Sequence, residues 1–150
     1  MVVVKKFKID NGDVSLRDFL SECNAMEAVR HPHIVMFLGA VIKPKNYSII
    51  LEYCAWGSLW SYLQNQDHNI SWEVRKRFAI EIAQAVLYLH ECHPPILHRD
   101  LKSLNIFLDE HLRIKIGDFG WTKTLDEYMT NKIGTYQWMA PEVIGNKPYT

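Results

Sequence analysis

A helix of about twenty residues, with the two prolines that follow it, constrains the fold of this chain more than any other feature. Between Ser71 and His90 the apolar side chains recur every three or four positions, as they do on one face of an amphipathic helix. Pro94-Pro95 excludes further helical turns, because proline lacks an amide hydrogen and clashes with the preceding turn. After Pro95 the pattern changes to short apolar runs separated by polar residues, which predicts short strands and loops. The predicted apolar face consists of Phe78, Ile82, Ala85 and Leu89.

The sequence before this helix alternates between strand and helix patterns. Residues 2–7 are β-branched and alternate with lysine, which predicts a strand. Residues 34–42 and 47–53 predict two strands joined as a hairpin, and Ser58 is a suitable cap for a short helix. An amphipathic helix is predicted from Ser15 until the stretch RHPH at residues 30–33 ends it. Its apolar positions are Leu16, Phe19, Leu20, Cys23, Met26 and Val29.

Composition indicates a globular chain that works inside the cell. With 150 residues, of which 48% are hydrophobic, the chain can build the core of one domain. Seventeen basic and seventeen acidic residues give no net charge, so neither nucleic acid nor an acidic membrane is an expected partner. The N-terminal residues do not make a secretory signal, and the longest apolar run is half a membrane span. A cytoplasmic location is therefore expected.

The three cysteines, Cys23, Cys54 and Cys92, are expected to be reduced, because their number is odd and their spacings are unrelated. A metal site at residues 90–93 (HECH) is an alternative interpretation of Cys92. No second Cys/His pair lies at zinc-finger spacing, so we interpret this stretch as a helix end.

Four polar residues beside short strands form the most informative group in the sequence. Asp100 and Asn105 lie on a loop that enters the predicted strand IFL, and Asp118 follows the next predicted strand, RIKI. If these strands pair through the short DEH connection, the three polar side chains meet at one edge of a hairpin. Two carboxylates and an amide oxygen suit Mg²⁺, while Lys102 supplies positive charge for a transferring phosphoryl group.

The same residues carry a family resemblance. HRDLKSLN at 98–105, DFG at 118–120 and APE at 140–142 resemble the signature set of protein kinases in order and spacing. The closest similarity is to serine/threonine enzymes of the tyrosine-kinase-like group, such as Raf and mixed-lineage kinases. The resemblance implies an α+β, bilobal kinase fold, with residues 1–53 in the small lobe and hinge start, and residues 54–150 in the large lobe.

The resemblance also implies roles for individual residues. Asp100 corresponds to the residue that orients the substrate hydroxyl, and Lys102 to the one that contacts the γ-phosphate of ATP. Asn105 and Asp118 correspond to the Mg²⁺ ligands. Lys5 corresponds to the lysine on the α- and β-phosphates, and period two favours it over Lys6 because it shares a strand face with Val3.

Further pocket positions follow from the same comparison. Glu22 corresponds to the ion-pair partner of Lys5, Leu51 to the gatekeeper, and Phe107 to the apolar platform below adenine. Glu52 to Cys54 corresponds to the hinge. The positions that stack between the helix and the metal loop are Met26, Phe37, His98 and Phe119.

Lys102 and Thr135 favour serine and threonine as the phosphorylated residues, because tyrosine kinases usually carry other residues there. Protein substrates with such hydroxyls are the expected partners. Arg99 resembles the arginine that pairs with a phosphorylated activation loop, which implies an upstream activating kinase. The candidate phosphosites, which the sequence does not rank, are Thr122, Thr124, Tyr128 and Thr130.

Departures from the family pattern leave an alternative function open. No glycine-rich loop precedes residue 2 and the later large-lobe helices have no counterpart, so we expect an incomplete domain and a loosely packed isolated chain. Glu142 is expected to lack its usual arginine partner, Val3 replaces alanine, and Trp121 replaces a smaller residue. The alternative is a catalytically inactive fragment that binds other proteins.

Overall fold

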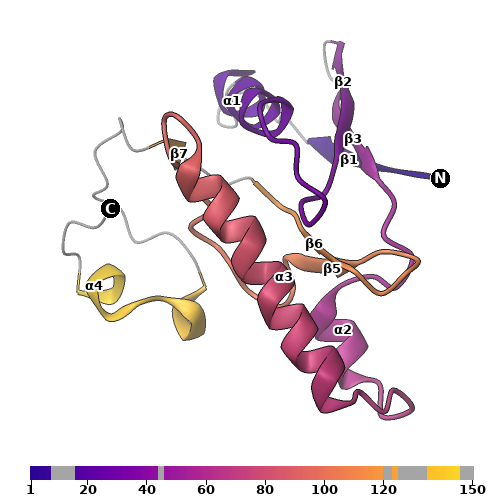
Figure 1. Cartoon of the computed structure of the whole chain (residues 1–150). Helices are drawn as coiled ribbons and strands as arrows, with labels where there is room; N and C mark the ends of the chain where they lie inside the picture. The colour runs from indigo at the N-terminus through magenta and orange to yellow at the C-terminus, as the bar shows by residue number, and fades with distance from the viewer. Residues whose placement is uncertain (8–15, 44–45, 120–122, 125–134, 146–150) are drawn as a thin grey trace.

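The computed structural model describes residues 1–7, 16–43, 46–119, 123–124 and 135–145. Figure 1 shows a small sheet with α1 (Leu16–Glu27) at one end of the molecule and α2 (Leu59–Gln64) at the other, with a short hairpin between these parts and the long helix α3 (Trp72–Glu91) running past it. The buried core is continuous through both parts, because residues from the sheet, the helices and the hairpin belong to one hydrophobic cluster.

The sheet contains β1 (Val2–Phe7), β2 (Phe37–Lys43) and β3 (Asn46–Glu52) in the order β1-β3-β2. All its pairs are antiparallel, and Val3 lies opposite Leu51. β2 begins three residues later than predicted. The preceding segment contacts β6 (Ile114–Ile116) instead: the Val35 amide donates to the Ile116 carbonyl at 2.8 Å.

Helix α1 (Leu16–Glu27) covers the sheet. Phe19 is fully buried and contacts Phe7 edge to face, with ring centroids 5.1 Å apart. The predicted apolar face is present, with two differences. Leu16 is 45% exposed at the start of the helix, and Val29 is buried beyond its end.

Helices α2 (Leu59–Gln64) and α3 (Trp72–Glu91) begin at serine caps. Ser58 accepts from the Ser61 amide as predicted, and Ser71 accepts from the Val74 amide. α3 ends at Glu91, one residue beyond the prediction, and buries three of its four predicted apolar residues. Ile82, the fourth, is half-buried.

The hairpin predicted around DEH is formed by β5 (Ile106–Leu108) and β6. Beyond it, β4 (Ile96–Leu97) pairs with β7 (Lys123–Thr124), a pairing that the sequence pattern did not predict. A 3₁₀ turn, η1 (Tyr136–Trp138), and α4 (Pro141–Ile144) follow. Glu142 is exposed in α4, so its carboxylate does not carry the cost of burial without an arginine partner.

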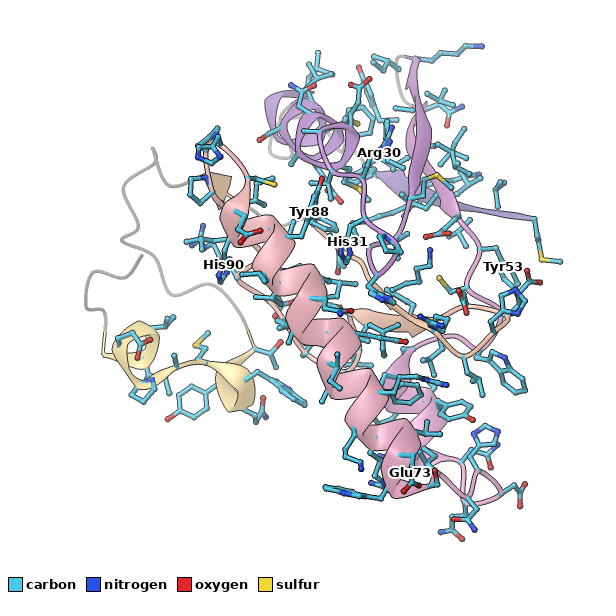
Figure 2. All side chains as sticks on the ribbon, viewed as in Figure 1. Arg30, His31, Tyr53, Glu73, Tyr88 and His90 are labelled. Atoms are coloured by element: carbon cyan, nitrogen blue, oxygen red, sulfur yellow. The ribbon has the colours of Figure 1, made fainter. Side chains whose placement is uncertain are left out.

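Tyr88 of α3 joins the helix to the loop between α1 and β2, as Figure 2 shows. Its hydroxyl accepts from the Arg30 amide at 3.0 Å, and the His31 ring stacks on its ring at a centroid distance of 5.0 Å. A second connection uses Glu81, a buried carboxylate of α3 that accepts from the Ile114 amide at 2.9 Å. α3 therefore supports both β6 and the loop before β2.

None of the helices in the described parts of the chain is long and apolar enough to cross a membrane. The boundary between residues 53 and 54 stays a prediction; β3 ends at Glu52 and α2 begins at Leu59.

Candidate active site

A cavity of about 480 Å³ lies where the sheet faces the β5–β6 hairpin. It is mostly apolar, with a few charged groups at one side, which is the usual character of a small-molecule site. Every residue predicted to bind the nucleotide lines it. These residues are Val3, Lys5, Glu22, Leu51, Glu52, Cys54, Phe107 and Asp118. The lining also includes Tyr53 of the predicted hinge and residues that were not predicted as nucleotide contacts, namely Met26, Val35, Gly57 and Gly117.

Lys5 brings together three segments that are distant in sequence. Its Nζ donates to Glu22 Oε1 at 2.8 Å and to Asp118 Oδ1 at 2.9 Å. Burial alone lowers the pKa of Lys5, but the hydrogen bonds and charges of Glu22 and Asp118 outweigh it and raise the pKa above 10.5. The ammonium group therefore stays charged and can face the phosphates of a nucleotide.

Glu52 has a second role that the sequence did not indicate. Its Oε1 accepts from the Met36 amide at 2.8 Å and lies 3.0 Å from Lys115 Nζ, and both charged side chains are largely buried. Lys115 belongs to β6, so this ion pair connects the last residue of β3 to the hairpin on the opposite side of the cavity.

Cys54 follows Glu52 in the predicted hinge and carries a neutral thiol. Burial, with the nearby charge of Glu52, raises its pKa to about 11. Cys23 and Cys92 are also free. The Cys92 Sγ donates to the Tyr88 carbonyl at the end of α3, which agrees with the interpretation of HECH as a helix end.

Asp100 lies beside this cavity in a dense group of hydrogen bonds. One carboxylate oxygen accepts from the Thr135 amide and hydroxyl at 3.1 and 3.0 Å. The other accepts from Asn105 Nδ2 at 2.9 Å and lies 2.7 Å from Lys102 Nζ. Lys102 also donates to the Thr135 hydroxyl at 2.7 Å. The three predicted catalytic residues and Thr135 are therefore in direct contact.

The contacts of Asp100 determine its ionisation. Burial raises its pKa, but the hydrogen bonds from Lys102, Thr135 and Asn105 outweigh this effect and hold the pKa below 3.8. A carboxylate of such low pKa is a weak base, so its main capacity is to orient a hydroxyl group and to stabilise positive charge near it.

Asn105 and Asp118 provide oxygen atoms suitable for Mg²⁺. Both hydrogens of the Asn105 amide are directed at Asp100, to its carbonyl at 2.8 Å and its carboxylate, which leaves Oδ1 as the atom available to a cation. Asp118 uses Oδ1 for Lys5 and is 41% exposed. One amide oxygen and one carboxylate fit a magnesium ion that completes its shell with phosphate and water.

Gly117 links the two halves of the site. Its amide donates to the Asn105 carbonyl at 2.9 Å, and its carbonyl accepts from His98 Nε2 at 2.9 Å. The His98 ring contacts Phe119 at a centroid distance of 5.3 Å, as expected for stacked positions. Burial lowers the pKa of His98 despite opposing contributions from Gly117 and the nearby carboxylates. The neutral ring therefore serves as a structural donor.

Two residues of the site adopt a left-handed backbone conformation. Arg99, before Asp100, has φ of 66°, and Asp118 has φ of 60°. Such values are uncommon for residues other than glycine. One of these conformations is at Asp118 itself and the other is directly before Asp100, and both aspartates are candidate functional residues.

Part of the predicted activation segment lies outside the described residues. This applies to Trp121 and to the candidate phosphosites Thr122, Tyr128 and Thr130. Thr124 belongs to β7, where it pairs with Ile96.

Comparison with known proteins decides the family. The protein kinase domain model matches residues 1–150. The chain belongs to the protein kinase family. The predicted resemblance and the mixed kinase-type fold are thereby confirmed, and members of this family use ATP.

Similar kinases have names that specify serine and threonine. A probable serine/threonine-protein kinase, drkC of Dictyostelium discoideum, is 40% identical over 157 residues, which cover 100% of this chain and 21% of the relative. The probable serine/threonine-protein kinase SIS8 of Arabidopsis thaliana is 41% identical, with 98% of this chain and 15% of the relative covered. The serine/threonine-protein kinase CTR1 of the same plant is 40% identical, with 89% and 17% covered. The chain thus spans between 15% and 21% of the length of these relatives.

Sequence reasoning missed Glu81, Lys115 and Gly117. Glu81 had a signal, because it lies on the apolar face of α3 near Phe78 and Ala85, where a carboxylate needs a buried partner. For Lys115 and Gly117 the sequence gives no such signal, since their contacts depend on which strands lie side by side in the fold.

Proposed function

We propose that the protein transfers the γ-phosphoryl group of ATP to serine and threonine hydroxyls of other proteins. The observation that carries this proposal is the contact of Asp100 with Lys102, Asn105 and Thr135, a group that the hydrogen bond between Asn105 and Gly117 joins to the cavity lining. A hydroxyl nucleophile next to Asp100 would be oriented by the carboxylate, and the adjacent ammonium of Lys102 would stabilise charge on the transferring group.

The cavity would hold the nucleotide. Apolar side chains such as Phe107 and Leu51 would enclose the base, and Lys5 would bind phosphate oxygens. Asn105 and Asp118 would hold Mg²⁺, which neutralises phosphate charge when it is bound. These residues would bind the nucleotide and orient its phosphates, and phosphoryl transfer requires little else from the protein.

The contacts of Thr135 support serine and threonine as acceptors, because the hydroxyl joins Asp100 to Lys102 beside the place where the acceptor must lie. We also propose that the protein acts in the reducing environment of the cytoplasm. The three free cysteines are consistent with such an environment. Arg99 would pair with a phosphate introduced by an upstream kinase.

Substitution of Asp118 tests the proposal. In the complete gene product, Asp118→Asn should abolish transfer of phosphate from Mg·ATP to a serine- and threonine-rich protein, while a fluorescent ATP analogue without Mg²⁺ still binds. Asp67→Asn, at an exposed position, is the matched control and should retain transfer. Undiminished transfer by Asp118→Asn would contradict the assignment.

A further inference from the structure

Gly117 occupies a place where no side chain fits. A Cβ atom built on it would lie 2.9 Å from Cε2 of Phe107 and 2.9 Å from Cγ2 of Val35, closer than real Cβ atoms approach carbon neighbours. Its backbone is not in a conformation that requires glycine. The reason for glycine here is therefore space, and the space is filled by two side chains of the nucleotide cavity.

The backbone around Gly117 is held on both sides. Its amide and carbonyl are hydrogen-bonded to Asn105 and His98, as described above. The Val35 amide is bonded to the Ile116 carbonyl, and the Ile116 amide to the His33 carbonyl, both at 2.8 Å. A methyl group on residue 117 could not be accommodated by moving these segments without breaking hydrogen bonds between buried groups.

Of the two side chains, Phe107 is the one that can move. Val35 is β-branched, 6% exposed and restricted at χ1. The Phe107 backbone is held between Lys115 of β6 and Ser58, but its half-buried ring borders the cavity. A larger residue at 117 would therefore displace this ring into the cavity.

We propose that Gly117 is a positioning residue for the nucleotide base. Because Gly117 has no Cβ atom, the Phe107 ring can occupy that space, and the cavity above the ring stays wide enough for a purine. This inference rests on the proposed function, since it takes the cavity as a nucleotide site. Gly117 acts through Phe107 and need not touch the base itself.

The test measures binding of a fluorescent N-methylanthraniloyl ATP analogue to the complete gene product, with the KM for ATP and kcat measured in parallel. Gly117→Ala should weaken binding about tenfold, a penalty in the usual range for overpacking. The loss should appear in KM rather than in kcat, because Phe107 lines the cavity whereas Asp100 does not.

A second substitution identifies Phe107 as the moving part. Phe107→Val removes Cδ2 and Cε2 and leaves only the contact with Val35 Cγ2, so in that background Gly117→Ala should weaken analogue binding about threefold or less. An equal loss in both backgrounds, or no loss from Gly117→Ala alone, would overturn the inference. If Gly117→Ala does not fold, adding both Phe107→Val and Val35→Ala removes every close contact of the new Cβ, so this triple variant must fold and bind like the Phe107→Val/Val35→Ala variant, and an unfolded triple variant would also overturn the inference. Failure of the unsubstituted protein to bind the analogue would instead contradict the proposed function.

Discussion

The Thr135 hydroxyl lies 3.0 Å from the Asp100 carboxylate and 2.7 Å from Lys102 Nζ, although the chain separates Thr135 from Asp100 by 35 positions. One hydroxyl group thus donates to the carboxylate and accepts from the ammonium at the same time. The backbone amide of Thr135 adds a further hydrogen bond to Asp100 at 3.1 Å. Thr135 therefore lies at the loop that carries the candidate catalytic residues.

Thr135→Val should lower kcat roughly tenfold to a hundredfold, because one hydrogen bond to a charged group is worth about 1.5–3 kcal/mol and Asp100 would lose it. The measurement is the steady-state rate of phosphate transfer to a protein substrate. Thr135→Ser keeps the hydroxyl and should restore most of the rate. If the valine and serine variants were equally slow, the hydroxyl would not be the group that matters.

Glu22→Gln should raise the KM for ATP roughly tenfold, because it removes the buried negative charge that fixes Lys5. Lys5 would then depend on Asp118 alone for an ionic partner among the contacts described here. Glu27→Gln provides a matched control, since Glu27 is an exposed residue of the same helix. Equal KM values for the two variants would argue against a role of Glu22 in binding.

The stability of the protein should fall as the pH drops below the ordinary histidine pKa of 6.5, in part because of His98. Its pKa is lowered in the folded state, so the unfolded state binds more protons in the window between the two pKa values. The contribution of His98 to stability is present above pH 6.5 and is lost as the pH falls to the pKa of His98 in the folded protein. The charged groups nearby are Asp118, Asp100 and Lys102.

His98→Asn should reduce this pH dependence by up to about 1.4 kcal/mol per pH unit within the window. The measurement is the free energy of unfolding of the complete gene product in urea between pH 5.5 and 7.5. The comparison variant is Gln84→Asn, at an exposed position of α3 without a titratable group, which should leave the slope as it is. Identical slopes for the unsubstituted protein and His98→Asn would disprove the contribution of His98.

Lys115→Met should lower the free energy of unfolding by about 2 kcal/mol, because it leaves the largely buried Glu52 carboxylate without its cation. Adding Glu52→Gln to this variant should recover part of the loss, since the uncompensated charge is then gone. Urea unfolding of both single variants and the double variant gives the coupling energy. A coupling energy near zero would show that the ion pair does not stabilise the connection between β3 and β6.

The sequence predicted those features that depend on neighbours along the chain. Strand β1, the start of α3 at Ser71 and the β5–β6 hairpin follow from periodicity and capping, which are local. The start of β2 was placed too early because residues 34–35 are as apolar as a strand, yet their backbone pairs with Ile116. No local pattern distinguishes these two uses of an apolar run.

The candidate site was predictable where order and spacing of polar residues identify a family. This applies to Asp100, Lys102, Asn105 and Asp118, and the structure places their predicted pocket partners around one cavity. The ion pair of Glu52 with Lys115 and the packing at Gly117 depend on distances between strands that are remote in sequence. Such distances are properties of the assembled fold.

The left-handed conformation of Asp118 has an evolutionary consequence. At such a φ, a residue other than glycine typically lowers the stability of the fold by about 1 kcal/mol. Asp118→Gly would therefore relieve backbone strain, but it would also remove a candidate magnesium ligand. Leu112, with φ of 55° at the turn between β5 and β6, shares this conformation, but its side chain packs against the core, so glycine there would lose packing while it eased the backbone. Relief of backbone strain alone would favour glycine at 118, so an aspartate kept there among active relatives would record selection for chemistry, whereas a leucine kept at 112 would record selection for core packing.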